Sequence, residues 1–173
     1  ESFGTNWRML EMQAVIGRIQ LRRMADWKRQ RQANAVRLSQ ALVPFAGEDG
    51  AVRLPAFGCA SCPGQCGAAG CEHAQYKFYA YVRPENLATG WSRDRIIEFI
   101  NAEGVPCYQG SCSEVYLEKA FDDTGWRPSH RLPVARELGE TALMFLVHPT
   151  LMEEEISITS TVVQQVMRQA SNN

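Results

Sequence analysis

The chain has 173 residues, of which 45% are hydrophobic, and its formal net charge is -1. Such a length suits one globular domain with a core, and the near-neutral charge predicts no bulk attraction to nucleic acid or to an anionic membrane. No apolar run approaches the roughly 20 residues of a membrane-spanning helix, and the N-terminus lacks a signal-peptide pattern, so we expect a cytoplasmic protein.

Residues 7–43 are predicted to form one long helix, or two helices joined by a slight bend. Thr5 or Asn6 is the expected N-cap, and Pro44 with residues 47–50 ends the helical pattern. Apolar residues recur at spacings of three to five and give the helix an apolar stripe on one face. The stripe consists of Met9, Met12, Ile16, Ile19, Met24 and Trp27.

The same helix is strongly basic between residues 18 and 37, where Asp26 is the single acid. Its basic residues are Arg18, Arg22, Arg23, Lys28, Arg29, Arg31 and Arg37. Clusters of this kind can bind nucleic acid. Helical spacing scatters these charges around the polar face, however, and no aromatic platform accompanies them, which favours a solvated or subunit-facing surface.

A short strand is expected at residues 51–55, and residues 58–73 then form a Gly-rich and Cys-rich segment that we interpret as an insertion. Four of the six cysteines lie there: Cys59, Cys62, Cys66 and Cys71. The first two have the Cys-x-x-Cys spacing of a zinc half-site, but the spacer before Cys66 is unusually short. Structural zinc bound by these cysteines, with His73 as a substitute ligand, free thiols and disulfides all stay open.

Residues 73–84 have the strongest strand pattern, because apolar side chains alternate with polar and aromatic ones. A helix follows, with Ser92 as its N-cap and Gly104 at its end. A short strand at 105–108 then leads into the polar segment 109–116.

Two cysteines lie in this region, Cys107 just before the polar segment and Cys112 within it. Neither is tied by spacing to a basic partner, so a nucleophilic role is not favoured. The hydroxyls of the segment, Glu114 and the two tyrosines Tyr108 and Tyr116 are candidates for binding a polar ligand. Short polar side chains also cap helices, and a capped loop before a helix near residues 117–121 is the simpler interpretation of each one.

The last elements are a helix at 134–138 ended by Gly139, an apolar strand at 141–147, and a final helix capped by Thr150. The order of elements predicts an α+β fold, in which a long N-terminal helix leads into a small, mostly antiparallel sheet with helices on one face. We expect two units, a connecting helix at residues 1–44 and a small domain at residues 45–173.

Residues 4–14 read Gly-Thr-Asn-Trp-Arg-Met-Leu-Glu-Met-Gln-Ala. They resemble the Gly-x-Asn-x-Arg-Met-x-Glu-x-Gln-Ala motif of the DegT/DnrJ/EryC1/StrS sugar aminotransferases, which opens a long helix after the cofactor domain. Residues 84–94, 104–106, 132–135 and 148–151 are also similar to the family. The resemblance thus spans nearly the whole chain, and the Cys-rich segment is its main departure.

The resemblance implies a pyridoxal 5'-phosphate (PLP) enzyme of fold type I that moves an amino group from an amino acid, expected to be glutamate, to a nucleotide-linked keto-sugar. Such enzymes serve polysaccharide or secondary-metabolite biosynthesis and work as homodimers with shared active sites. By the motif, Asn6 would bind the cofactor phosphate of the neighbouring subunit, and Arg8 would face the same pocket. Tyr108 and Ser111, near the mouth of the active site, would contact substrate.

PLP chemistry needs a lysine that forms a Schiff base. Lys28, Lys77 and Lys119 are the only lysines, and none lies in the family's Ser-x-x-x-Lys context. We therefore expect the C-terminal part of a larger enzyme, inactive alone, with Glu1 at a boundary and not at a biological start. The alternatives are a zinc-stabilised interaction module that uses the basic helix, and a fragment of a PLP-dependent sugar dehydratase of this family, in which histidine replaces the lysine.

Overall fold

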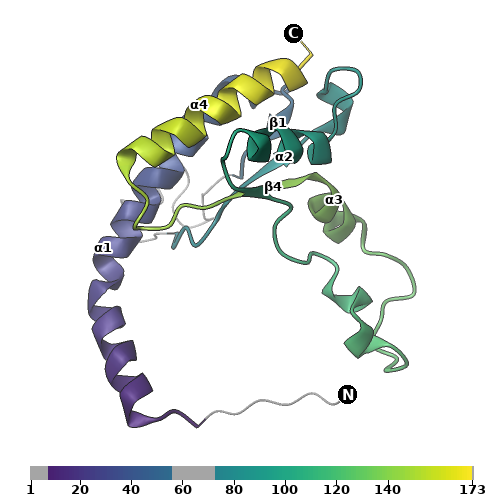
Figure 1. The fold of residues 1–173 in the computed structure, drawn as a ribbon. Helices are drawn as coiled ribbons and strands as arrows, with labels where there is room; N and C mark the ends of the chain where they lie inside the picture. The colour runs from purple at the N-terminus through teal and green to yellow at the C-terminus, as the bar shows by residue number, and fades with distance from the viewer. Residues whose placement is uncertain (1–7, 56–72, 173) are drawn as a thin grey trace.

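A computed structural model describes residues 8–55 and 73–172 of the chain. The long N-terminal helix, a four-stranded antiparallel sheet and three further α-helices form the predicted α+β fold (Figure 1). The elements are α1 (Glu11–Leu42), β1 (Val52–Arg53), β2 (Phe78–Val82), α2 (Arg93–Ala102), β3 (Cys107–Tyr108), α3 (Pro133–Thr141), β4 (Ala142–Phe145) and α4 (Glu153–Ala170). Within the described ranges, no helix is long and apolar enough to cross a membrane.

The sheet has the strand order β1-β2-β4-β3, and every pair of neighbours is antiparallel. In the central pair, Phe78 lies opposite Phe145 and Ala80 lies opposite Leu143. All four side chains are buried. The longest strands therefore form the middle of the sheet and carry the centre of the core.

The two faces of β2 differ as the alternating sequence predicts, with every second residue buried. Its buried face belongs to the core, which α2, α4 and the C-terminal half of α1 complete. The short helix α3 lies near β2 on the opposite face, where Arg53 of β1 forms an ion pair with Glu137 of α3 at 3.5 Å. This second face carries Tyr79 and Tyr81, which are only partly buried, and it leads to the polar site described below.

The N-terminal ends of the three longest helices, α1, α2 and α4, follow two patterns. Ser92 caps α2 as predicted, because its hydroxyl accepts a hydrogen bond from Arg95 N at 3.2 Å. The cap predictions for the other two long helices are wrong: α4 begins after Met152 and not at Thr150, and α1 begins after Leu10, beyond Thr5 and Asn6, which lie outside the described residues. In both, the third helical residue accepts from the N–H just before the helix, as half of a capping box. The pairs are Leu10 N to Gln13 Oε1 at 2.8 Å and Met152 N to Glu155 Oε2 at 2.7 Å.

The helix α3 continues past Gly139, where the sequence predicted its end. The guanidinium of Arg93, which comes from the first turn of α2, donates to the carbonyl oxygens of Gly139 at 3.0 Å and Ala142 at 3.2 Å. Helix C-termini leave such carbonyls without intrahelical partners. A side chain distant in sequence therefore satisfies the end of α3, and a terminating glycine conformation is not needed.

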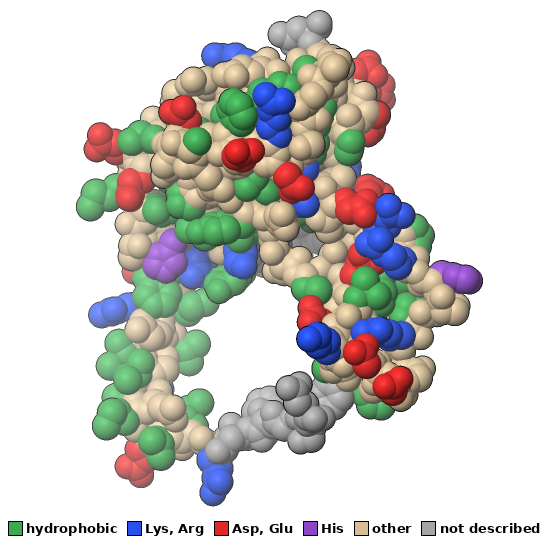
Figure 2. Space-filling model, turned by 45° about the vertical axis from the view of Figure 1, so that its right-hand side comes forward, with side chains coloured by type: hydrophobic (Ala, Val, Ile, Leu, Met, Phe, Trp, Pro, Cys, Tyr) green, Lys and Arg blue, Asp and Glu red, His purple; other side chains and the backbone are tan. Residues whose placement is uncertain are grey.

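The two halves of α1 lie in different surroundings. From Asn34 to Leu42 the helix has five buried residues and packs against α4. The first half extends away from the sheet (Figure 1), and hydrophobic side chains line this projecting part in Figure 2. The exposed apolar residues here are Met9 and Leu10, just before α1, and Met12, Val15, Ile16, Ile19, Leu21 and Met24 within it. Most of the predicted apolar stripe is thus uncovered in the described part of the chain.

Candidate functional site

A polar pocket of about 550 Å³ lies between the segment that follows β3 and the helix α3. Its lining joins two stretches that are distant in sequence. They contribute Gln109, Gly110, Ser111, Cys112, Ser113, Glu114, Leu117, Glu118 and Lys119 from the first stretch, and Arg136, Gly139 and Glu140 from α3. Hydroxyl, carboxylate, amide and cationic groups thus share one open hollow, which suits a ligand rich in hydrogen-bonding groups.

The turn at Gly110 and Ser111 starts the pocket wall directly after β3. Gly110 has φ +96°, a conformation that favours glycine. The hydroxyls of Ser111 and Tyr79, which lies on β2, are 3.1 Å apart and hydrogen-bonded. The sheet therefore fixes the position of Ser111.

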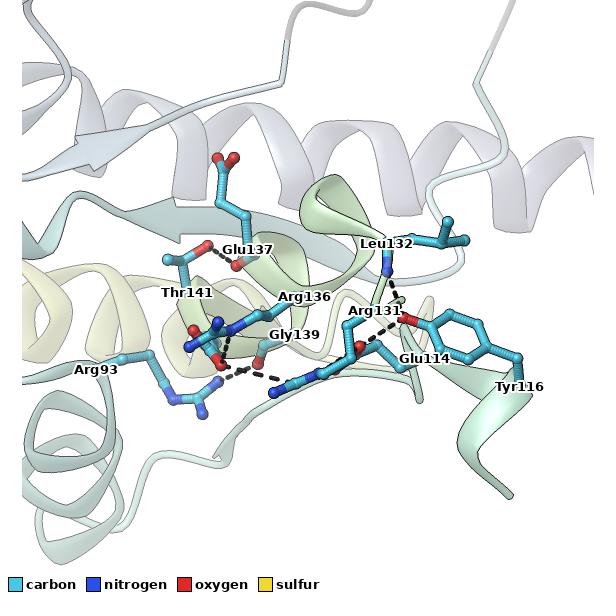
Figure 3. A network of polar contacts seen from close by, with 10 residues as sticks. Arg93, Glu114, Tyr116, Arg131, Leu132, Arg136, Glu137, Gly139 and Thr141 are labelled. Atoms are coloured by element: carbon cyan, nitrogen blue, oxygen red, sulfur yellow. Dashed lines mark hydrogen bonds and ion pairs between the residues drawn. The ribbon is translucent and has the colours of Figure 1, made fainter. Parts of the chain in front are cut away.

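The wall lies against α3 at Gly139. A Cβ atom at this position would collide with the Ser113 hydroxyl, so glycine permits the contact. Arg93 donates to the Gly139 carbonyl from the neighbouring helix (Figure 3). Gly139 thus serves the packing of the pocket wall, whereas the sequence suggested a helix stop.

In the pocket wall, Glu114 is held by Arg131, from the chain that leads to α3, and by the nearby Tyr116 (Figure 3). Arg131 binds both carboxylate oxygens, with 2.9 Å between Nε and Oε1, and the Tyr116 hydroxyl donates to Oε1 at 2.6 Å. The Tyr116 oxygen in turn accepts from Leu132 N at 2.9 Å. The hydrogen bonds from Arg131 and then from Tyr116 lower the pKa of Glu114 to about 2.

A second arginine, Arg127, holds the short 3₁₀ helices Val115–Leu117 and Lys119–Phe121 in place. Its guanidinium donates to the carbonyl oxygens of Tyr116 and Leu117, each at 2.9 Å, and of Glu118 at 3.1 Å. It also pairs with Asp122. Several directed bonds therefore order a segment that has little regular structure of its own.

Neighbouring carboxylates limit the positive charge available inside the pocket. Arg136 Nε donates to Glu140 Oε1 at 2.8 Å, one turn apart on α3. Lys119 lies beside Glu118, whose carboxylate accepts a hydrogen bond from the Cys112 thiol at 3.4 Å. Cations and carboxylates are therefore mixed, and the pocket is better suited to hydroxyls and amides than to a highly charged anion.

The two cysteines near the pocket are poor nucleophiles. Burial raises the pKa of the Cys107 thiol to about 12. The hydrogen bond that Cys112 donates to Glu118 raises the pKa of its thiol. Both thiols are thus neutral near pH 7, which agrees with the weak case for nucleophilic cysteine in the sequence.

The predicted site residues are only partly brought together. Ser111 lines the pocket, and Tyr108 is exposed at the end of β3, three residues before it. Arg8 is exposed and precedes α1, whose first turns lie at the end of the helix away from the sheet (Figure 1). Asn6 lies outside the described residues, so its role as a phosphate ligand stays a prediction.

The predicted zinc ligands Cys59, Cys62, Cys66 and Cys71 also lie outside the described residues. His73, the proposed substitute, is exposed, and its Nδ1 accepts a hydrogen bond from Gln75 N at 3.1 Å. In residues 8–55 and 73–172, no group of three or more His, Cys, Asp or Glu side chains could hold a metal ion. Zinc binding therefore has no support here and stays a prediction.

Sequence reasoning missed most of the pocket's charged residues. Arg136 lay within an unremarkable short helix, Glu140 followed the glycine at which that helix was predicted to end, and Arg131, which holds Glu114, looked like part of an extended connector. Tyr79 looked like the polar side of a strand. The arginines that follow the polar segment, Arg127, Arg131 and Arg136, are a signal that could have indicated a supported loop, since arginine holds carboxylates and carbonyls through several directed bonds.

Solved structures with this fold include several aminotransferases. The aminotransferase from Psychrobacter cryohalolentis is 54% identical over 97% of this chain, with a TM-score of 0.85. NtdA from Bacillus subtilis with bound cofactor PMP matches 98% of the chain at 20% identity, with a TM-score of 0.72. DesV of S. venezuelae, in complex with a ketimine intermediate, matches 96% at 22% identity, with a TM-score of 0.70. At these low identities the last two matches show the fold alone.

The fold and the high identity to a solved aminotransferase place the chain in that class. It belongs to the DegT/DnrJ/EryC1/StrS aminotransferase family, whose model matches residues 1–166. The chain spans 41% of the Psychrobacter aminotransferase, 35% of NtdA and 39% of DesV. No curated protein matches it.

Proposed function

We propose that the chain is the C-terminal part of a PLP-dependent aminotransferase that transfers an amino group from an amino acid, glutamate in our proposal, to a nucleotide-linked keto-sugar. The observation that carries the proposal is the 54% identity to an aminotransferase over 97% of the chain. The motif at residues 4–14, which opens the long helix in this family, supports it further. The proposed setting is the synthesis of cell-surface polysaccharide or of secondary-metabolite sugars.

The exposed half of α1 supports a larger parent enzyme. Contiguous apolar surfaces of this kind mark interaction sites in soluble proteins. The chain spans 41% of the Psychrobacter enzyme, so a relative of that length has a further domain available to cover this surface. We propose that the cofactor domain covers this surface. Residues 1–44 are then the connecting unit, and residues 45–173 form the small domain.

PLP, when bound, supplies the electron sink and the amino carrier that transamination requires. In the parent enzyme Asn6 would donate its side-chain amide to the cofactor phosphate, and Arg8 would bind a carboxylate or a sugar-nucleotide oxygen through its planar guanidinium. Arg8 precedes the N-terminus of α1, where unpaired N–H groups also favour anions. The proposed active site is shared between the two subunits of a homodimer.

The pocket of this chain would bind part of the sugar nucleotide. Ser111 contributes a hydroxyl that can donate and accept, and exposed Tyr108 offers an aromatic face and a hydroxyl at the same end of the sheet. Arg136 is paired with Glu140 and Lys119 lies next to Glu118, so the polar groups of the pocket match sugar hydroxyls better than a diphosphate. We therefore assign it to the sugar part of the substrate.

The proposal is tested with the complete reading frame that encodes this chain. We expect an upstream domain with a lysine that forms a Schiff base, and PLP-dependent amino transfer from glutamate to a dTDP-linked or UDP-linked keto-deoxysugar. The 173-residue chain alone should give no Schiff-base absorbance band with PLP and no transfer. Such a band from the short chain would contradict the proposed division of the enzyme.

Replacement of Asn6 tests the cofactor contact separately. In the complete enzyme, Asn6→Ala should weaken PLP binding measured by equilibrium dialysis, while Asn6→Asp should weaken it further by placing a carboxylate beside a phosphate. Loss of water from the sugar without amino transfer would identify a dehydratase of the same family. A complete reading frame without a lysine-bearing domain would favour a non-enzymatic interaction module.

A further inference from the structure

We propose that Tyr79 is a positioning residue that fixes the turn at Gly110 and Ser111 for binding of the sugar substrate. This inference rests on the proposed function, in which Ser111 contacts the sugar nucleotide. Tyr79 lies on β2 and does not itself line the pocket, whereas Gly110 and Ser111 do. Tyr79 would therefore act on substrate through the turn.

Two separate contacts join Tyr79 to the turn. Its hydroxyl is 3.1 Å from the Ser111 hydroxyl. Its ring lies so close to Gly110 that a Cβ atom at that position would be 2.7 Å from Tyr79 Cε1, closer than side-chain carbons approach one another. The positive φ of Gly110, +96°, adds a second reason why glycine is needed there. The ring thus fixes the path of the backbone while the hydroxyl fixes the next side chain.

The Tyr79 ring is itself held by a row of side chains on the same face of the sheet. It stacks on Tyr81 with 6.4 Å between ring centroids and an angle of 14° between the planes. The guanidinium of Arg53 lies 4.7 Å from the centre of the Tyr81 ring, and Arg53 pairs with Glu137 of α3 at 3.5 Å. One continuous row of contacts therefore links α3, which forms one side of the pocket, to the turn that forms the other.

The hydrogen bond also determines what Ser111 can offer a ligand. A serine hydroxyl has one proton and two acceptor positions and otherwise rotates freely. Either hydroxyl can donate in this bond, and in our proposal Tyr79 donates to Ser111, so that the serine proton is directed away from Tyr79 and is available for an oxygen of the ligand. A fixed donor costs less conformational entropy on binding than a freely rotating one. Tyr79 should therefore strengthen binding of a hydroxylated sugar with little effect on the chemical step.

The test uses the complete enzyme with a dTDP-linked or UDP-linked keto-deoxysugar as acceptor and glutamate as donor. Tyr79→Phe keeps the ring and removes only the hydroxyl, so it should raise the KM for the acceptor about three- to tenfold, the range expected for one hydrogen bond. The kcat and the KM for glutamate should stay within about twofold of the wild type. Tyr81→Phe is the matched control, because in the described part of the chain the Tyr81 hydroxyl makes no hydrogen bond, and it should leave all three constants unchanged.

A double-mutant cycle with Ser111→Ala tests whether the effect passes through Ser111. We expect Tyr79→Phe to add nothing to Ser111→Ala, because the shared bond is already lost. Hydrogen–deuterium exchange of the peptide that contains residues 109–113 should rise in Tyr79→Phe and not in Tyr81→Phe.

Additive effects in the cycle, an unchanged KM for the acceptor in Tyr79→Phe, or equal losses of kcat with both substrates would each overturn the assignment of Tyr79. If the wild-type enzyme aminates neither acceptor, the proposed function fails and the assignment fails with it. If the wild type is active and the kinetics of Tyr79→Phe are unchanged, the assignment of Tyr79 fails and the proposed function stands.

Discussion

The two halves of α1 are built from the same kinds of residues but have opposite surroundings. Leu38, in the second half, is 1% exposed and lies against the core, whereas Leu21, in the first half, is 70% exposed. The helix is continuous between them, and both halves carry apolar side chains at helical spacing. The difference comes from α4, which packs against the second half. Helical periodicity therefore fixes which residues share a face, while the neighbouring elements decide whether that face is buried.

Matched leucine substitutions provide the strongest test of this comparison. Leu38→Ala should lower the free energy of unfolding of the chain by about 2–5 kcal/mol, because it opens a cavity in a packed core. Leu21→Ala should change it by less than about 0.5 kcal/mol, as exposed substitutions do. Urea denaturation of the 173-residue chain measures both.

Equal losses from the two substitutions would contradict the comparison, because they would mean that the first half of α1 is covered even in the isolated chain. Measurements at two protein concentrations identify self-association as the cause, since its contribution changes with concentration. Under the proposed function, the cofactor domain of the complete enzyme would cover this half. There we expect Leu21→Ala to become destabilising while Leu38→Ala keeps its effect.

Two glycines, Gly104 and Gly110, allow a similar comparison, between a position without neighbours and one in the pocket wall with a close neighbour. Both have positive φ, +96° at Gly110 and +79° at Gly104, but only Gly110 has a side chain within contact distance. Gly104→Ala should cost about 1–3 kcal/mol from backbone strain alone. Gly110→Ala should cost more, because the new methyl group also displaces the Tyr79 ring. Thermal unfolding of the two variants measures the difference, and equal losses would mean that the ring moves aside freely.

Asn34 lies where the buried half of α1 begins, and its substitution should lower the stability less than the core and pocket-wall substitutions above. It is buried, donates to the His148 carbonyl oxygen at 3.2 Å and accepts from Gln30 at 3.2 Å. Asn34→Ala should lower the free energy of unfolding by about 1–2 kcal/mol, since it leaves a partly buried carbonyl without its donor. Gln32→Ala is the control, because Gln32 makes a longer, exposed bond of 3.4 Å to the His73 carbonyl oxygen. A similar loss of stability from both variants would mean that burial of the Asn34 hydrogen bonds adds nothing to their contribution.

Much of the fold could be predicted because its signals are local. The alternation in β2 and the hydroxyl cap of Ser92 each depend on a few neighbouring residues, and both predictions are confirmed. The predicted end of α3 at Gly139 failed because Arg93, far away in the sequence, satisfies the carbonyl there. The cap at Thr150 failed because α4 begins after Met152, whose N–H donates to Glu155, while the Thr150 hydroxyl is hydrogen-bonded to His148. The Arg93 contact shows that a local rule fails where a competing partner comes from a distant part of the sequence.

The site was harder to predict than the fold. Ser111 was identified through a family resemblance, and its pocket depends on α3, which begins about twenty residues later in the sequence and reaches the site only through the tertiary fold. Glu114 was recognised as a polar candidate, but nothing near it in sequence indicated that Arg131 would bind it. Pairings across a long loop follow from tertiary geometry, which composition and spacing do not encode.

The Glu114–Arg131 pair gives the smallest expected effect and one that depends on pH. The pKa of Glu114 falls from its ordinary value of 4.5 to about 2 in the folded chain, so the folded state binds fewer protons than the unfolded state between these values. The stabilisation from the pair is therefore complete above about pH 4.5 and is lost as the pH falls toward about 2. Because Arg131 is about half exposed, solvent screening keeps the contribution small.

Glu114→Gln should remove this part of the acid sensitivity, because the amide does not titrate and keeps most of the shape of the carboxylate. The stability of the variant, measured by urea denaturation at several pH values, should fall less steeply below about pH 4.5 than that of the wild type. Glu118→Gln is a suitable control, because it replaces a carboxylate of the same pocket that Arg131 does not bind. If the two variants had the same acid profile, the pairing with Arg131 would not contribute to the stability of the pocket wall, and the wall would depend on Arg127 and the Tyr79 contact instead.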